Sequence, residues 1–211
     1  MLFRILAHRS QLLQLMRKLT LLAVAAALLC SCCGSGKQEN MAKDFLTLAT
    51  ERYSVRKFSD APVDRGKIDR IIEAGRVAPT AVNSQPQRIF VATSPESVAK
   101  LNGITPCMYG ASHCFIFCCD TDRVCKRGDR GDYGDIDVTI VLTHMMLAAA
   151  ELGVGTCPVG YFDPEKLVCE LGLPDNVRPI LLMPFGYAAE DAAPSPKHTE
   201  YRPVEETVEF I

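Results

Sequence analysis

The chain lacks most of the short motifs that would indicate a metal or a nucleotide. His-Glu-x-x-His is absent, and no Cys-x-x-Cys occurs in residues 34–211, so the usual anchors of catalytic zinc and of thioredoxin-like chemistry are missing. There is no GxGxxG and no GxxxxGK(S/T), which removes the sequence argument for a Rossmann site or a P-loop. Tryptophan is absent altogether. We therefore predict no metal site.

A strong charge imbalance is also missing. The net charge is −2, so no whole-chain field attracts the protein to nucleic acid, and no nucleic-acid partner is expected. The 211 residues are 48% hydrophobic, which suits one globular domain. Basic clusters must therefore be interpreted as local sites.

The N-terminal segment has the pattern of a leader. Two cations precede the apolar run LTLLAVAAALL, which ends in LCSC. This pattern predicts a signal sequence at 1–32 with a lipobox-like Cys32 as lipidated first residue, a polar tether at 33–41 and a domain at 42–211. Met16 is an alternative start to Met1. A working leader implies a membrane-anchored lipoprotein facing the periplasm or cell exterior, and a non-functional one implies the cytoplasm.

The cysteine count opposes export. Seven cysteines follow Cys33, an odd number that cannot pair completely, and free thiols are a liability in an oxidising compartment. His113 and Cys114 with Cys118 and Cys119 could suggest a metal cluster, but buried cysteines acting as small hydrophobes explain this group better. Alternation along a strand would put Cys114 and Cys118 on one face and Cys119 on the other. His144, on a long apolar helix, is expected to lie in the core.

Strands alternate with helices along the domain, which implies a sheet flanked by helices. Residue types and periodicity predict strands at 88–93, 114–120 and 178–188, with a short strand and turn within 153–161. A first helix should turn Phe45, Leu48 and Ala49 inward. Further helices are expected at 64–78 with Asp64 as cap, 94–101, 135–152 and 163–172. The helix at 135–152 should be central and buried, and the glycine-rich connection before it mobile. The tail from 190 to 211 suits an arm that reaches a partner subunit.

RYSVRKF, residues 52–58, concentrates cations in an extended segment. Arg52, Ser54 and Arg56 share one face of such a chain, opposite Tyr53 and Val55. The two arginines would lie roughly 13 Å apart, which suits a long ligand with an anion at one end and an electron-rich group at the other. A solvated basic patch is the alternative.

Two later segments complement this one. APTAVNSQPQ places Thr80, Asn83 and Gln85 in a loop whose side chains and amides can bind the edge of a planar heteroaromatic group. GVGTCPVGY offers Gly160, where a ring can approach the backbone because no Cβ intervenes. Lys197 and Arg202 supply late cations.

In this order, RYSVRKFSDAPV, EAGRVAPTAVNSQPQRIF, MMLAAAELGVGTCPVGYFDPEKL and RPILLMPFGY resemble the nitroreductase-like flavoenzymes over roughly residues 42–211. The resemblance implies an α+β fold: a three-layer α/β/α sandwich with a mixed, mainly antiparallel sheet in a domain-swapped homodimer. It also implies FMN at the subunit interface.

The resemblance further implies roles for individual residues. Arg52 and Ser54 would hold the phosphate and ribityl end of FMN, and Arg56 would reach the pyrimidine edge. The remaining cofactor-binding residues would be Tyr53, Pro79, Thr80, Ala81, Asn83, Gln85, Pro158, Val159, Gly160, Lys197 and Arg202. KHTEYR is longer than the family's usual basic spacing. No catalytic acid or base is implied.

The implied activity is transfer of a hydride from NAD(P)H through flavin N5 to a small planar, electron-poor acceptor such as a nitroaromatic or quinone, by a ping-pong mechanism. Reductive dehalogenation and flavin fragmentation are alternatives on the same fold. A lipid-anchored binding module that has lost its cofactor is an alternative of another class.

Overall fold

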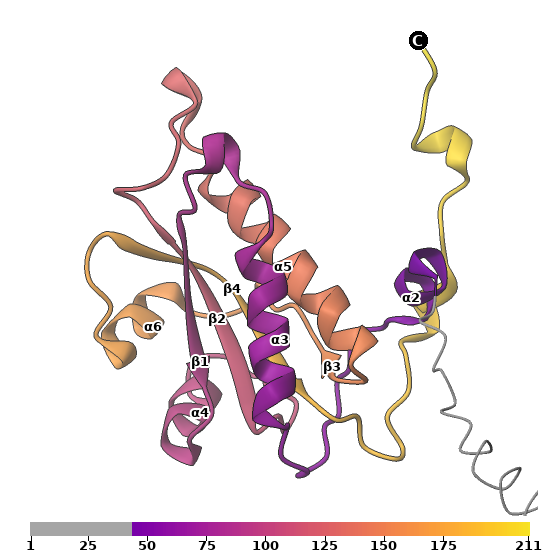
Figure 1. The fold of residues 1–211 in the computed structure, drawn as a ribbon. Helices are drawn as coiled ribbons and strands as arrows, with labels where there is room; N and C mark the ends of the chain where they lie inside the picture. The colour runs from indigo at the N-terminus through magenta and orange to yellow at the C-terminus, as the bar shows by residue number, and fades with distance from the viewer. Residues whose placement is uncertain (1–43) are drawn as a thin grey trace, which may run out of the picture. The chain divides into compact units, whose positions relative to one another are not determined.

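A four-stranded sheet organises residues 44–211, which the computed structural model describes (Figure 1). The strands are β1 (Gln87–Ala92), β2 (His113–Asp120), β3 (Gly155–Thr156) and β4 (Val177–Gly186), in the order β1-β2-β4-β3. Each neighbouring pair is antiparallel. Among the described residues, the parallel contribution is one isolated bridge between Ser54 and Thr156. The predicted α+β fold with a mainly antiparallel sheet is confirmed.

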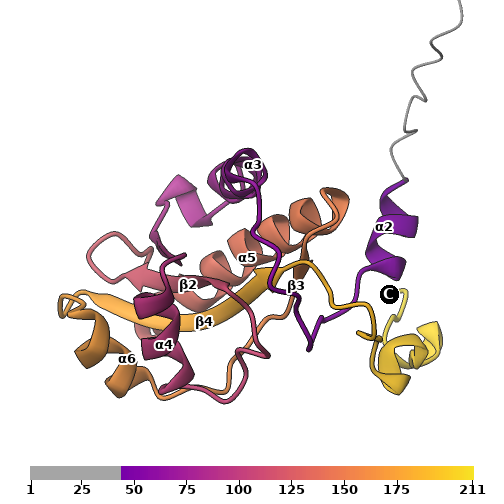
Figure 2. The ribbon, with the colours of Figure 1, turned by 90° about the horizontal axis from the view of Figure 1, so that it is seen from below.

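Strand β2 is buried along its whole length because helices cover both faces of the sheet (Figure 2). Phe115, Phe117 and Cys119 belong to the core that includes residues of α3 (Arg65–Arg76) and α5 (Gly134–Glu151). Cys114 and Cys118 belong to the opposite core, with residues of α4 (Pro95–Asn102) and α6 (Pro164–Leu171). Burying each large side chain contributes about 1.5–3 kcal/mol. The three layers and the alternation of the cysteines are as predicted.

Helix α3 begins where the sequence predicts. The Asp64 carboxylate accepts from the Gly66 and Lys67 amides and so caps the first turn. Ile68 and Ile71 are buried at helical spacing. Gly75 lies against α5, and a Cβ added there would be 2.7 Å from the Met145 side chain. The close α3–α5 contact therefore depends on the missing side chain.

Helix α5 is less buried than predicted. Val138, Val141, Leu142 and Met145 pack into the core, but Ile136 is 44% exposed. His144 is exposed too, so its assignment to the core was wrong. Apolar residues of α5 therefore also lie on the side of the helix that the described residues do not bury. Gly153, with φ +71°, follows the helix and confirms the predicted end.

Both ends of the described chain expose hydrophobic side chains. Asp44 caps α2 (Phe45–Glu51), whose Phe45 is 70% exposed, so the predicted inward orientation is wrong for this residue. Leu48 and Ala49 are half-buried. The tail contains η3 (Pro196–Thr199) and η4 (Val204–Glu206) and ends with Phe210 96% exposed. The reach of this tail to a partner stays a prediction.

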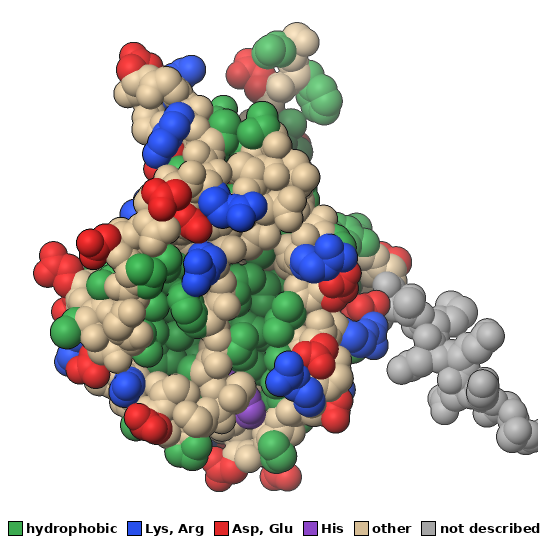
Figure 3. Space-filling model, turned by 60° about the vertical axis from the view of Figure 1, so that its left-hand side comes forward, with side chains coloured by type: hydrophobic (Ala, Val, Ile, Leu, Met, Phe, Trp, Pro, Cys, Tyr) green, Lys and Arg blue, Asp and Glu red, His purple; other side chains and the backbone are tan. Residues whose placement is uncertain are grey.

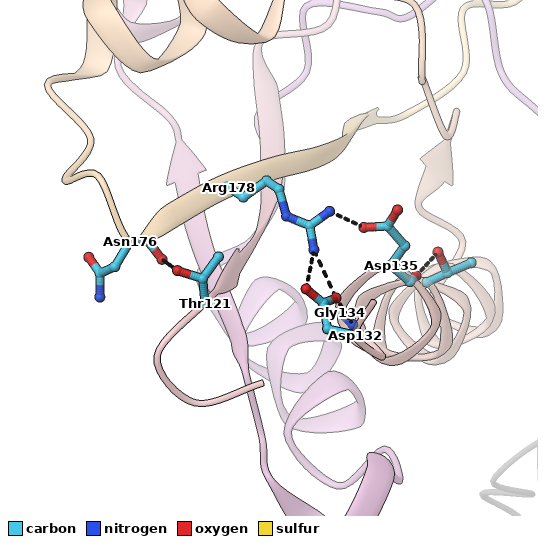
Figure 4. A network of polar contacts seen from close by, with 7 residues as sticks. Thr121, Asp132, Gly134, Asp135, Asn176 and Arg178 are labelled. Carbon is cyan, nitrogen blue, oxygen red and sulfur yellow. Dashed lines mark hydrogen bonds and ion pairs between the residues drawn. The ribbon is translucent and has the colours of Figure 1, made fainter. Parts of the chain in front are cut away.

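The connection between β2 and α5 is held at both ends rather than free (Figure 4). Arg178 on β4 donates to Asp132 at 3.0 Å and to Asp135 at 2.8 Å. At the other end, the Asn176 carbonyl accepts from the Thr121 amide at 2.8 Å. A short 3-10 turn, η2 (Gly128–Arg130), lies between them. Asp132 therefore holds the end of this connection against β4, and the mobility of the segment between the two contacts stays a prediction.

The predicted signal sequence, Cys32 and the tether lie outside the described residues. Within residues 44–211, no helix is long and apolar enough to cross a membrane.

Candidate functional site

The RYSVRKF segment lies along β3. The Val55 amide donates to the Thr156 carbonyl at 2.9 Å, beside the Ser54–Thr156 bridge. Val55 is 2% exposed and covers Gly155, where an added Cβ would be 2.6 Å from a Val55 methyl group. Because Val55 points inward, its two neighbours Ser54 and Arg56 are directed away from the core.

Those outward residues line one pocket of about 240 Å³, as the alternation predicts. Arg52, Ser54 and Arg56 all contribute to it. Tyr53 lines it as well, although simple alternation placed this residue on the other face. Among the described residues, no carboxylate forms an ion pair with Arg52 or Arg56. Two uncompensated guanidinium groups beside a hydroxyl form a site suited to an anion.

The C-terminal region adds a third cation. Ser195, Lys197 and His198 line the same pocket. The His198 ring lies 3.1 Å from the Thr50 carbonyl and makes an edge contact with Tyr53 at 6.2 Å between centroids. These contacts hold η3 against the end of α2, which brings Lys197 to the pocket. Arg202 is not brought there: its guanidinium binds the Glu206 side chain and carbonyl.

Pro158, Val159 and Gly160 follow β3 after one intervening residue, Cys157. Val159 exchanges two backbone hydrogen bonds with Leu182 on β4, at 2.8 and 2.9 Å, and is buried. Gly160 is exposed, its φ is not left-handed, and an added Cβ would be at 3.7 Å, an ordinary contact, from Leu181. This chain's own fold therefore does not require glycine at 160.

The loop at 79–85 lies away from the arginine pocket in this chain, beyond the end of α3 (Figure 1). Its backbone is strained: Val82, Asn83 and Gln85 have φ of 49°, 55° and 46°. The Gln85 amide donates to the Thr80 hydroxyl, and the Ala81 amide donates to the buried Asp137 at 2.9 Å. Asp137 thus fixes the strained loop to α5. One chain does not bring this loop and the arginines together.

Two residues beside the RYSVRKF segment, Cys157 and Tyr109, were missed by the sequence analysis. Cys157 is buried beneath the segment: burial raises the pKa of its thiol, whereas the Arg56 charge and a hydrogen bond with Ser54 lower it. Tyr109 has a strained φ of 53°. A hydrogen bond with Cys107 is the main reason that the pKa of Tyr109 is raised, and a hydrogen bond from Arg56 opposes this. No motif linked residue 109 to residue 56, because only the fold makes them neighbours.

The comparisons with known proteins agree with this geometry. The sequence profile described as "Nitroreductase family" matches residues 49–106 and 100–187. The chain belongs to the nitroreductase family. A Bacillus subtilis relative named FMN reductase [NAD(P)H] is 29% identical over 167 residues, which cover 70% of this chain and 67% of the relative.

Solved structures of nitroreductases share the fold. A nitroreductase family protein from Clostridium difficile 630 is 36% identical with a TM-score of 0.75, and the match covers 80% of this chain and 98% of that one. A structure from Exiguobacterium sibiricum, determined in complex with FMN, is 20% identical with a TM-score of 0.69 and covers 81% and 98% of the two chains. At that identity, the second match supports the fold alone.

Proposed function

We propose that this nitroreductase-family chain is an NAD(P)H-dependent oxidoreductase that binds FMN in the pocket of Arg52, Ser54, Arg56 and Lys197. The observation that carries the proposal is the convergence of three cations and a hydroxyl on one pocket beside β3. The relatives named FMN reductase and NADPH-dependent oxidoreductase support both the cofactor and the electron donor.

The described residues fit such a cofactor. Arg52, Ser54 and Lys197 supply donors for a phosphate group, and neither Arg52 nor Lys197 forms an ion pair with a carboxylate of residues 44–211. Pro158 and Gly160 would lie against the ring, where the absence of a Cβ leaves room for close approach. FMN held by these residues would supply hydride transfer at N5 between NAD(P)H and an electron-poor acceptor, a nitroaromatic or quinone, in a ping-pong sequence.

Arg56 is the residue that we expect to influence the reaction. Its guanidinium lines the pocket and donates to the Ser54 carbonyl at 3.4 Å, and it would lie at the pyrimidine edge of FMN, which gains negative charge on reduction. A cation that is already oriented stabilises this charge without reorganising its surroundings. No side-chain acid or base is needed, because the proton balance can be met by solvent.

The strained loop at 79–85 would complete the site from a second copy of the chain. This loop, which carries Thr80, Ala81, Asn83 and Gln85, lies away from the pocket in its own chain. The backbone at Asn83 and Gln85 is held in a left-handed conformation that costs free energy. Figure 3, which looks toward the side of edge strand β1, shows hydrophobic side chains gathered in a hollow between charged residues. A homodimer would cover such a surface.

A titration with FMN tests the cofactor assignment. We expect the purified protein to be yellow, or an apoprotein to bind added FMN with quenching of flavin fluorescence. Reduction by NADH or NADPH under anaerobic conditions should bleach the absorbance near 450 nm, and a quinone or nitroaromatic should restore it. A folded protein that stays colourless and gives no heat on titration with FMN would overturn the proposal.

We also propose that the leader anchors the protein at Cys32 outside the cytoplasm. The apolar run and the following cysteine support this location. Cell fractionation with a Cys32→Ser variant tests it: the natural chain should be in the membrane fraction with a lipid-modified Cys32, and an unmodified soluble chain would contradict the proposal.

A further inference from the structure

Backbone strain in residues 44–211 is concentrated in the loop at 79–85. Of the four non-glycine residues there with a positive φ, three lie in this loop: Val82, Asn83 and Gln85. Val82 is β-branched, and side chains of that kind rarely adopt its φ of 49°. Such conformations persist only where the surrounding structure imposes them. The loop therefore needs a contact that holds its shape.

A buried carboxylate on α5 supplies this contact. Asp137 is 2% exposed, and its Oδ1 accepts a hydrogen bond from the Ala81 amide at 2.9 Å. Asp135 lies in the same first turn of α5, but its carboxylate accepts instead from Arg178 at 2.8 Å. Two acidic residues of one helical turn thus have different partners, and the hydrogen bond to the strained loop comes from Asp137.

The same region leaves buried polar atoms unpaired. Within residues 44–211, the buried side-chain oxygens without a hydrogen-bond partner are Ser84 Oγ, Gln87 Oε1 and Asp137 Oδ2. Ser84 follows the 3-10 turn η1 (Ala81–Asn83), and Gln87 is the first residue of β1. Unpaired buried oxygens and positive φ angles both cost free energy. The arrangement of this loop is therefore not explained by the stability of its own chain.

We propose that Asp137 is a positioning residue for the FMN site of the other subunit. By holding the Ala81 amide, it keeps the loop at 79–85 in the shape that binds the flavin edge, whereas the cations of that site, Arg52 and Lys197, belong to the second chain. The loop lies away from its own chain's cations (Figure 1). This inference rests on the proposed function, because the loop meets FMN only where two chains share the site.

Single substitutions test the hydrogen bond. Asp137→Ala should weaken FMN binding about tenfold, because the loop is then free to relax. Asp137→Asn keeps an acceptor for the Ala81 amide and should stay within about threefold of the natural affinity. Asp135→Ala, which removes the same charge from the same turn but not the contact with the loop, is the matched control and should bind FMN normally. Hydrogen exchange of the loop amides in the apoprotein should be faster in Asp137→Ala alone.

Mixed dimers test whether Asp137 acts on the site of the other chain. One chain carries Asp137→Ala and the other Arg52→Ala, and different affinity tags isolate the mixed species. One of its two sites then combines a natural loop with natural cations, so we expect half of the sites to bind FMN with natural affinity. The control pairs a natural chain with an Asp137→Ala/Arg52→Ala chain and should have no site of natural affinity.

A second variant covers the case in which Asp137→Ala does not fold. Ala81→Pro removes the same hydrogen bond from the donor side. Thr80 is already extended, with φ −134° and ψ 158°, as the residue before a proline must be. This variant should show the same loss of FMN affinity and the same recovery in mixed dimers with Arg52→Ala, and natural affinity would contradict the positioning role.

The outcomes separate this inference from the proposed function. Natural affinity in Asp137→Ala, or an equal loss in Asp135→Ala, would overturn the positioning role. Natural affinity in the control dimer instead of the first mixed dimer would show that Asp137 acts within its own chain and would overturn the inference, as would a natural chain that binds FMN as a monomer. A folded natural chain that binds no FMN would instead overturn the proposed function. Hydrogen exchange would then still decide whether Asp137 holds the loop.

Discussion

At the scale of single residues, the pocket depends on which cations are left without a counter-charge. Lys57, next to Arg56 in sequence, pairs with Asp191, and Arg202 pairs with Glu206. Arg52, Arg56 and Lys197 have no carboxylate partner among the described residues and face one cavity. The chemistry of an arginine is therefore set by its neighbours as much as by its type.

Replacing the phosphate-site cations should weaken cofactor retention. We expect Arg52→Ala and Lys197→Ala each to lower FMN affinity about tenfold to a hundredfold, since each removes a charged donor. Arg202→Ala is the matched control, because this late cation points to Glu206, and its affinity should stay within about twofold of the natural value. Isothermal titration with FMN measures all three, and equal losses in all three would contradict the site.

Arg56→Gln should act on the reduction potential rather than mainly on binding. Glutamine keeps hydrogen bonding but removes the charge near the pyrimidine edge, so the two-electron potential should fall by about 30–60 mV, where 30 mV corresponds to about 1.4 kcal/mol. Spectroelectrochemistry of the FMN-loaded variant gives this value. An unchanged potential would reject the role of Arg56.

His113 should make stability depend on pH. Burial against Phe185 lowers the pKa of this imidazole below its usual value near 6.5. The unfolded chain then binds a proton more readily than the folded one between that pKa and 6.5. The contribution of His113 to the free energy of unfolding should therefore be complete above pH 6.5 and decrease as the pH falls below 6.5.

His113→Gln tests this assignment with urea unfolding from pH 5 to pH 8. The free energy of unfolding of the variant should fall less steeply below pH 6.5 than that of the natural chain. This holds whatever the stability of the variant at pH 8. A variant with the same pH profile as the natural chain would show that other groups cause the decline.

At the scale of elements, two glycines near β3 serve different purposes. Gly155 lets the RYSVRKF segment pack on the strand, since a Cβ there would meet Val55 at 2.6 Å. Gly160 has only an ordinary contact with Leu181. Packing within this chain therefore requires glycine at position 155. It does not require glycine at position 160, where the missing Cβ can instead make room for a ligand.

Alanine at these two positions should separate folding from binding. Gly155→Ala should lower the free energy of unfolding by about 1–3 kcal/mol through overpacking and should also weaken FMN binding by displacing Ser54. Gly160→Ala should leave the free energy of unfolding within about 0.5 kcal/mol and weaken FMN binding alone. Urea unfolding and fluorescence titration report the two effects. Loss of stability in Gly160→Ala would contradict its assignment to the cofactor.

At the scale of the whole molecule, several hydrophobic side chains of residues 44–211 are exposed. Val82 is 84% exposed on the strained loop, and Phe210 is 96% exposed near the C-terminus. Ile136 is an exposed hydrophobic side chain on α5. These positions agree with the proposed homodimer, in which the site would be shared between two chains.

Removing residues 203–211 should therefore produce a monomer that binds FMN poorly. The deletion removes Phe210 but keeps Lys197 and the rest of the pocket. Light scattering after gel filtration gives the mass, and FMN titration gives the affinity. A truncated chain that remains dimeric with full affinity would show that the tail does not join the subunits.

Much of the element order could be predicted because it depends on local chemistry. Asp64 and Asp163 cap α3 and α6, and Gly153 ends α5, as their residue types predict. Alternation also placed Cys114, Cys118 and Cys119 on the correct faces of β2. His144 and Phe45 were misplaced because periodicity identifies an apolar surface without showing what covers it.

Local sequence determined the elements, the cation-bearing segment and, through ordered motifs, the family. Only tertiary structure decided that Lys197 joins Arg52 while Arg202 does not, and that Tyr109 packs against the RYSVRKF segment. The reason is physical: caps and strand alternation depend on neighbours a few residues away, whereas a pocket depends on contacts between segments about 50 to 150 residues apart, which only the packing of the sheet establishes.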